Sequence, residues 1–280
     1  MNNYGRAIDY FEQVFDKNPN HEDAIKIIVK IYKNKEEYKT ALTYIQKLTD
    51  KNIENLKEKI FILGKLHKIK EIKQYKTIKE VQYEVAKALY ENNQNVKPIL
   101  ENLDNPDAKL LLSKIYFNEN DFEKAKEIIQ KIDSDSHEFL NYKGLFALEE
   151  MNFTEAIKYF SKACSKKQNP VYFYNLGNAY FFNGWFPEAQ KAYSKAIYLE
   201  PNNSDYRYSL AYLYYSTKDF DKCQKELDAI SEYPQAKILQ ALLYNNKNEY
   251  NKALEILERQ IKNGFDNEFT LTSLSKTYVY

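Results

Sequence analysis

Apolar residues recur along this chain with the spacing of one face of an α-helix, and the same pattern returns many times. In the stretch from Phe186 to Leu199, the aromatic Phe186 lies three positions before the small Ala189, and the large Tyr193 lies four positions after it. These three positions share one helical face. The small position returns at Ala7, Ala41, Ala125, Ala156, Cys223 and Ala253, each time between an aromatic and a large apolar residue. The pattern predicts a family of amphipathic helices that pack alike.

A second apolar pattern precedes the first and predicts a partner helix for each copy. In its clearest form, Leu176 and Gly177 lie shortly before Tyr180. A large apolar residue, then a smaller one, then a tyrosine at the same offset return at Ile28–Tyr32, Leu112–Tyr116, Leu210–Tyr214 and Leu274–Tyr278. Gly177 and Ala211 are one repeat of about 34 residues apart, a period typical of helix–turn–helix repeats.

The combined pattern resembles the tetratricopeptide repeat (TPR) family. The copy that fits best supplies Phe173, Leu176, Gly177, Tyr180, Ala189, Tyr193, Ala196 and Pro201. The resemblance implies an all-α fold, a TPR-type helical-repeat solenoid. Antiparallel helix pairs would stack into a right-handed superhelix, with a concave groove lined by the first helix of each pair. Small residues would let helices approach closely, while the large ones fill the grooves between them.

We expect one solenoid over residues 1–280. Residues 1–104 hold partial and degenerate repeats, beginning with a second helix over Tyr4–Lys17 that ends at Pro19. Within 52–104 the second helices are short. Residues 105–267 hold regular repeats, at about 106–135, 137–168, 170–203, 204–233 and 234–263. Residues 268–280 form a lone terminal helix.

The amino-acid composition favours a helical fold and argues against some classes of binding partner. Six glycines and seven prolines are too few for the turns of an all-β sandwich or a Rossmann fold. A net charge of +1 argues against duplex nucleic acid as the main partner. Cys164 and Cys223 fit buried, reduced thiols. No apolar run is long enough to span a membrane and no signal-peptide pattern begins the chain, so we expect a cytoplasmic protein without membrane insertion.

No catalytic or phosphate-binding motif is present in the sequence. The three histidines, His21, His67 and His137, are isolated, and capping or exposure explains them better than metal ligation or catalysis. The lysine-rich stretch from Lys57 to Lys79 fits a solvated hairpin face better than a site for RNA, anionic lipid or an acidic partner. We therefore expect no enzyme activity, no cofactor and no metal.

The TPR resemblance also implies which positions face a ligand. In this chain those positions are rich in aromatic residues with asparagines between them, which suits contact with a peptide. The predicted peptide-binding residues are Asn141, Tyr142, Tyr174, Asn175, Asn178, Phe181, Phe182, Tyr208, Tyr212 and Tyr215. Two known TPR specialisations are not matched: the basic residues of a carboxylate clamp are missing, and so is a repeated asparagine ladder.

These observations predict a non-catalytic scaffold or adaptor that holds a protein or peptide segment in the groove. Two alternatives stay open: the targeting array of a larger enzyme such as a glycosyltransferase, and a bacterial envelope or secretion assembly factor. Self-association through the terminal helices is a further expectation, because an open repeat end exposes apolar surface.

Overall fold

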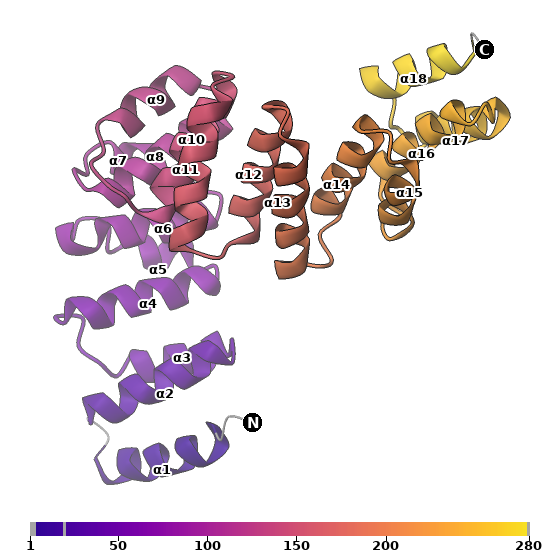
Figure 1. Ribbon diagram of the computed structural model, residues 1–280. Coiled ribbons are helices and arrows are strands. Elements are labelled where there is room, and N and C mark those ends of the chain that lie inside the picture. Colours follow the sequence, from indigo (N-terminus) through magenta and orange to yellow (C-terminus); the bar gives the residue numbers. More distant parts are fainter. Residues whose placement is uncertain (1–3, 19–20, 279–280) are drawn as a thin grey trace. The chain divides into compact units, whose positions relative to one another are not determined.

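The computed structural model describes residues 4–18 and 21–278, and within them the fold is all-helical (Figure 1). The helix ends predicted at Pro19 and Tyr280 lie outside the described residues. The helices are α1 (Tyr4–Lys17), α2 (Glu22–Asn34), α3 (Tyr38–Ile45), α4 (Ile53–Lys65), α5 (Ile69–Lys73), the short η1 (Lys79–Val81), α6 (Gln82–Glu91), α7 (Lys97–Leu100), α8 (Pro106–Asn118), α9 (Phe122–Gln130), α10 (His137–Glu149), α11 (Phe153–Lys166), α12 (Pro170–Phe182), α13 (Phe186–Leu199), α14 (Ser204–Ser216), α15 (Phe220–Asp228), α16 (Pro234–Asn246), α17 (Tyr250–Lys262) and α18 (Glu268–Tyr278).

Neighbouring helices pack in successive pairs, as the predicted fold class requires. Two compact units emerge, residues 1–133 and residues 134–280. Seven first helices, α2, α4, α8, α10, α12, α14 and α16, have the same length of 13 residues. The continuity of one solenoid across both units stays a prediction.

The same turn joins the two helices of each pair. One residue takes the left-handed conformation, and the next backbone N–H donates to the carbonyl five residues before it, over 2.8–3.0 Å. This is the Schellman arrangement, which satisfies a carbonyl at the helix end. The left-handed residues are Glu36, His67, Asn93, Asn120, Met151, Gly184, Lys218 and Asn248. The turn is therefore kept in the degenerate part of the chain as well, although Gly184 is the one glycine among them.

Polar caps begin most helices of the second unit. The side chains of Ser136, Asn152, Asn169, Asn203 and Asp219 each accept a hydrogen bond from a backbone N–H in the first turn. Such caps satisfy donors that have no partner within the helix. They fix where each helix starts, and so which side chains share its faces.

Small residues sit where large ones from the partner helix press against them. A Cβ added at Gly177 would lie 2.6 Å from the buried Tyr193 ring, and one at Gly144 would lie 2.5 Å from Phe160. Ser113, in the same position of another pair, donates from Oγ to the Ala125 carbonyl over 2.8 Å. Of the small positions in the second helices, Ala41, Ala125, Ala156, Ala189, Cys223 and Ala253 are completely buried. The predicted packing of the pairs is confirmed.

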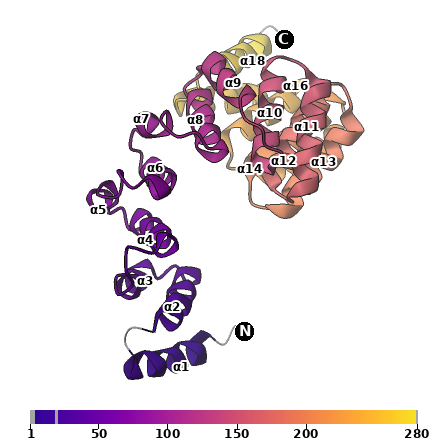
Figure 2. The same ribbon diagram turned by 90° about the vertical axis from the view of Figure 1, so that its left-hand side faces the viewer.

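The second helices of residues 52–104 are short, as predicted. Helix α5 has five residues and α7 has four. Both are visible as short helices beside α4, α6 and α8 (Figure 2). Buried aliphatic side chains still form a continuous core in this unit, including Leu56, Leu63 and Val85.

Both cysteines are free and buried, and burial raises the pKa of each thiol to about 12. They therefore act as small apolar side chains. Among the described helices, none combines the length and the apolar character needed to cross a membrane.

Candidate functional site

Helices α12 and α14 bring five of the predicted binding residues around one pocket of about 290 Å³. Helix α12 supplies Asn178, Phe181 and Phe182, and α14 supplies Tyr208 and Tyr212. Because residues three and four apart share a helical face, each group projects from one side of its helix. The lining is completed by Ser209 of α14 and Tyr193 of α13.

Aromatic rings run across this pocket in an unbroken series of contacts. Neighbouring ring centroids lie 5.6 Å apart for Phe182 and Phe181, 5.8 Å for Phe181 and Tyr212, and 6.4 Å for Tyr212 and Tyr208. These separations are within the range of favourable aromatic pairs. Phe182 is 58% exposed and Tyr212 is 37% exposed, so two of the rings offer open surface to a ligand.

The series continues beyond the pocket at both ends. Phe153, at the start of α11, stacks on Phe182 at 5.8 Å, and Tyr233, just before α16, packs edge-on against Tyr208 at 5.9 Å. Phe186 contacts Phe181 at 5.7 Å from the start of α13. One aromatic surface thus crosses successive pairs of the second unit, and we call these seven rings (Phe153, Phe181, Phe182, Phe186, Tyr208, Tyr212 and Tyr233) the aromatic series.

A half-buried polar contact joins two of the lining residues. The Tyr193 hydroxyl donates to Asn178 Oδ1 over 2.7 Å. Burial raises the pKa of Tyr193 well above its ordinary value, and the neighbouring Tyr174 adds to this effect. Burial likewise raises the pKa of Tyr208 to about 12. Both hydroxyls therefore stay protonated well into the alkaline range.

The other five predicted residues lie elsewhere in the second unit. Asn141 and Asn175 are buried, and Asn175 Nδ2 donates to Asn141 Oδ1 over 2.9 Å. Tyr174 packs between Tyr193 at 6.1 Å and Tyr206 at 5.1 Å.

The last two are half-buried on α10 and α14. Tyr142 lies on α10. On α14, the Tyr215 hydroxyl accepts a hydrogen bond from Asn246 Nδ2 over 3.0 Å, and its ring packs on Phe220. The structure does not bring these five residues to the 290 Å³ pocket.

Five contributors were not among the predicted site residues: Ser209 and Tyr193 of the pocket lining, and Phe153, Phe186 and Tyr233 of the aromatic series. Phe153, Phe186 and Tyr193 were assigned to packing because they occupy the aromatic and large positions of the second-helix pattern. The aromatic position directly follows the turn, which places Phe153 and Phe186 beside the end of a first helix. That recurring proximity is the sequence signal that could have identified them.

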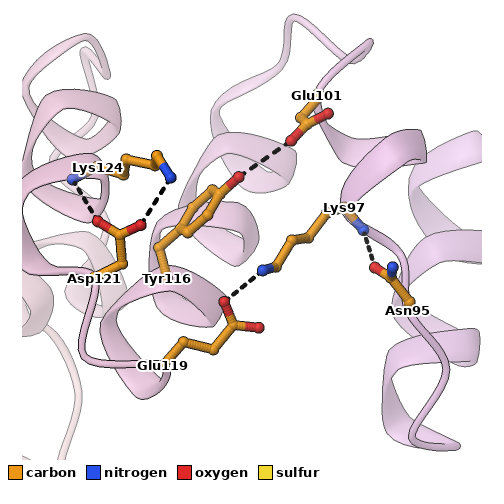
Figure 3. Close-up of polar contacts among 7 residues, drawn as sticks. All are labelled: Asn95, Lys97, Glu101, Tyr116, Glu119, Asp121 and Lys124. Atoms are coloured by element: carbon orange, nitrogen blue, oxygen red, sulfur yellow. Dashed lines mark hydrogen bonds and ion pairs between the residues drawn. The ribbon is translucent and has the colours of Figure 1, made fainter.

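Rings in the first unit have a different environment. Phe61 is 40% exposed, but Lys33 Nζ lies 4.8 Å and Lys65 Nζ 5.4 Å from its centroid. Tyr116 lies between Lys97 at 4.7 Å and Lys124 at 5.3 Å (Figure 3). Cations above a ring face are attracted to it, so these rings already have partners.

Figure 3 also shows how polar contacts hold the short α7. The Tyr116 hydroxyl donates to Glu101 Oε1 over 3.1 Å, and Lys97 pairs with Glu119, the C-cap of α8. Lys124 pairs with Asp121, the N-cap of α9, over 2.9 Å, and this hydrogen bond lowers the pKa of that carboxyl. The contacts connect α7, α8 and α9.

Two hollows of about 610 Å³ and 340 Å³ lie on either side of this network. The larger is lined mainly by the polar 91–97 turn, and the smaller has a rim of Lys109, Lys124 and Lys131. Each of these three lysines pairs with a nearby acid. By volume alone, these two hollows would be better candidates for a binding site. Their lysines, however, already pair with acidic side chains, whereas the pocket of the second unit has exposed aromatic rings.

Several lysines of the lysine-rich segment and all three histidines make local contacts. Lys59 pairs with Asp50 over 2.9 Å and Lys65 with Glu91 over 3.1 Å. His21 caps α2, accepting from the Ala24 N–H, while His137 bonds the Tyr172 hydroxyl over 2.8 Å. His67 Nδ1 lies 2.6 Å from Asn92 Oδ1. Within residues 4–18 and 21–278, no group of three or more His, Cys, Asp or Glu side chains could hold a metal ion.

Comparison with known families gives three matches, all to models of the tetratricopeptide repeat. They cover residues 106–134, 170–203 and 192–225. No curated protein matches the sequence.

Solved structures share the fold at low sequence identity. A chain of the APC/C Cut9–Hcn1 hetero-tetramer superimposes with a TM-score of 0.67 and 13% identity, covering 99% of this chain and 59% of that one. PilF of Pseudomonas aeruginosa has a TM-score of 0.54 and 16% identity, with 79% and 99% covered. A tetratricopeptide repeat protein from Parabacteroides merdae has a TM-score of 0.53 and 14% identity, with 96% and 98% covered.

This chain therefore spans 59% of the length of the Cut9–Hcn1 chain. Identities this low establish a shared architecture and leave partners open. The paired helices, the repeated turn, the small-against-large packing and the matching repeat models agree. The chain is a tetratricopeptide repeat protein.

Proposed function

We propose that the protein is a non-catalytic interaction module that holds a segment of a partner protein against the aromatic series of its second unit. The observation that carries the proposal is the pocket between α12 and α14, with Phe182 and Tyr212 exposed beside it. TPR domains typically mediate protein–protein contacts. One structure with this fold belongs to a hetero-tetramer.

Physical chemistry supports this use of the surface. Soluble proteins rarely leave connected apolar surface uncovered without a binding role. Tyrosine and phenylalanine provide large contact areas with few rotatable bonds, so little conformational entropy is lost when a ligand settles on them. Such residues at the centre of an interface carry much of its affinity.

The pocket also differs from a catalytic site. Its lining residues, Asn178, Phe181, Phe182, Tyr193, Tyr208, Ser209 and Tyr212, include no carboxylate, imidazole or thiol. Tyr193 and Tyr208 are protonated at neutral pH, and burial raises both pKa values further above that range. The arrangement suits holding a segment in place, without proton transfer or nucleophilic attack.

A peptide-display selection tests the proposal. A library of random linear peptides is selected on the immobilised protein, and each enriched peptide is re-tested on a Phe182→Ala/Tyr212→Ala double variant. Tyr198→Ala is the matched control, since this tyrosine is 76% exposed on α13 but does not line the pocket.

We expect the enriched peptides to bind the parent and the Tyr198→Ala protein equally and to lose about tenfold or more of their affinity for the double variant. Enriched peptides that bind all three proteins equally would contradict the proposed site. Circular dichroism establishes that the variants remain folded, which is expected because both substituted rings are exposed.

A further inference from the structure

Lysine side chains lie over aromatic ring faces in the second unit as well as in the first. Lys143 Nζ lies 4.7 Å from the centroid of Phe139, and Lys195 Nζ lies 5.2 Å from the centroid of Tyr198. A cation in this position is attracted by the negative face of the ring. At these places the protein covers its ring faces with its own cations.

The aromatic series differs from these rings. Within residues 4–18 and 21–278, no lysine or arginine lies over any of its seven rings. Helix α12 contains no lysine or arginine, and no residue lining the pocket is charged. Arg207, the one cation of α14, donates to the Pro201 carbonyl and to Glu226. The series therefore offers ring faces to which the neighbouring helices bring no free cation.

The rings that line the pocket also differ in orientation. The plane of Phe181 is turned by 80° from that of Phe182 and by 54° from that of Tyr212. Their centroids lie only 5.6 Å and 5.8 Å from that of Phe181, and a cation is attracted to a ring within about 6 Å of its centroid. A cation held in the pocket can therefore lie near more than one ring.

The lining has acceptors for the N–H groups of such a cation. The tyrosine hydroxyls and Ser209 carry lone pairs, and Asn178 Oδ1, which accepts from Tyr193, can accept a second hydrogen bond. A cation with several N–H groups could thus donate to the lining while it contacts the rings.

Formal charge at one end of the aromatic series also favours a cation. The Tyr233 hydroxyl donates to the carboxylate of Asp205, which is exposed on α14. Since Arg207 pairs with Glu226, the charge of Asp205 is not cancelled by the other ionised residue of its helix. A cation on the series is attracted by this carboxylate and by the ring faces, whereas an anion is repelled by both.

Arginine suits this surface better than lysine. Its guanidinium group is planar, stacks on aromatic faces and is more weakly hydrated than an ammonium group. The pocket lining has no carboxylate that would compensate for the lost hydration of a lysine ammonium. The least strongly hydrated cation of a protein chain is therefore the one expected to enter.

Resting on the proposed function, we infer that the aromatic series binds an arginine side chain of the partner segment, with the guanidinium stacked on the rings of the pocket and donating to the lining hydroxyls and Asn178. The partner segment is then basic where it meets the second unit. Single-stranded nucleic acid also stacks on aromatic side chains, but its backbone needs a positively charged track, which the lining does not offer.

Fluorescence anisotropy with a labelled glycine–serine peptide that carries arginines tests the inference on the purified full chain. A matched peptide has citrulline at the same places, which keeps the shape of the side chain and removes its charge. A third peptide has lysine there, and an oligothymidine of similar length represents nucleic acid. We expect the arginine peptide to bind about tenfold more tightly than the citrulline peptide, and more tightly than the lysine peptide.

Two double variants separate attraction to the ring faces from apolar contact. Phe182→Leu/Tyr212→Leu keeps large apolar side chains but removes two aromatic faces, so the preference for arginine over citrulline should largely disappear. Phe182→Ala/Tyr212→Ala should lose the preference and the remaining affinity. Tyr198→Ala is the matched control and should behave as the parent, because this exposed ring lies outside the pocket and already has Lys195 over it.

The outcomes separate the inference from the proposed function. Absence of binding by the arginine peptide, equal binding of the citrulline or lysine peptide, or tighter binding of oligothymidine overturns the inference. So does a preference for arginine that survives in the leucine variant. If the inference fails while display-selected peptides lose affinity for Phe182→Ala/Tyr212→Ala, the proposed function stands and only the class of segment is wrong. If the selected peptides are also insensitive to that variant, both are wrong.

Discussion

Phe61 and Tyr116 of the first unit and Phe182 and Tyr212 of the second unit have different surroundings. In the first unit, lysines lie above Phe61 and on both sides of Tyr116. In the second unit, Phe182 and Tyr212 contact other rings, and no lysine lies over them within the described residues. At these positions, aromatic residues therefore pack against lysines in the first unit and form an exposed surface of contacting rings in the second.

Local packing beside these rings differs as well. In the first unit, Lys97 of the four-residue α7 lies over Tyr116 and pairs with Glu119. In the second unit, helices α11 and α13 have 14 residues each and pack against their partners through Phe160 and Tyr193. Phe182 of α12 and Tyr212 of α14 remain exposed at the pocket.

The largest expected effect comes from comparing one glycine in each unit. Gly177→Ala places a methyl group 2.6 Å from the buried Tyr193 ring, so the free energy of unfolding should fall by roughly 1–3 kcal/mol. In Gly64→Ala the new methyl group lies 3.2 Å from the Ala88 methyl, and the gain in helix propensity, about 1 kcal/mol, offsets the crowding. Urea denaturation of both variants measures the change. Equal losses of unfolding free energy in the two variants would contradict the closer packing of Gly177 against Tyr193.

Alkaline pH should destabilise the second unit in particular. Burial raises the pKa values of Tyr172, Tyr206 and Tyr208 to about 12, above an ordinary value near 10. Their contribution to stability is therefore complete below about pH 10 and is lost as pH rises through about 12.

Denaturation midpoints measured across this range, with tyrosinate absorbance as the titration signal, check the expectation. Tyr208→Phe removes one of the titrating groups and should lose less stability than the parent between about pH 10 and 12. Equal losses in both proteins would contradict the assignment of Tyr208.

Left-handed turn residues offer a stabilising change. Met151 has φ 56° and is 77% exposed, so Met151→Gly removes backbone strain without losing packing and should stabilise by about 1 kcal/mol. Asn120 occupies the same position in the first unit with φ 63°, but asparagine tolerates this conformation, so Asn120→Gly should gain less. Thermal melts of the two variants provide the measurement, and a loss of stability in Met151→Gly would contradict the expected relief of strain.

The smallest effect is expected at the exposed ion pair that holds α7. Glu119→Gln removes the charge paired with Lys97 while keeping the shape of the side chain. Because exposed ion pairs contribute little and are screened by salt, the melting temperature should fall slightly at low ionic strength and stay unchanged at high ionic strength. A large fall that persists in salt would show that α7 depends on this pair far more than the account allows.

Much of the fold was predictable because packing constrains residue size at fixed intervals. Gly177 facing Tyr193 and Gly144 facing Phe160 follow from small residues in one helix and large ones in the next. The shortness of α5 and α7 was predictable too, since the second-helix pattern weakens between residues 52 and 104. These patterns lie within single helices and recur in many repeats, so they predict the helix pairs without information on how the helices are arranged in space.

The remaining features depend on how helices meet. Met151 and Lys218 take left-handed turns that their residue types do not favour, because the surrounding pair of helices imposes the turn. Asn141 and Asn175 carry the same ligand-facing signal as Asn178, yet they bond each other. Their separation from the pocket is set by the packing of α10 on α12, which residue spacing alone does not reveal.

The most direct test of the central claim compares the two kinds of ring in one binding measurement. The best peptide from the display selection is titrated calorimetrically into the parent, into Phe182→Ala/Tyr212→Ala and into Phe61→Ala. We expect about tenfold or greater loss of affinity in the double variant and parental affinity in Phe61→Ala. Parental affinity in the double variant would contradict this expectation.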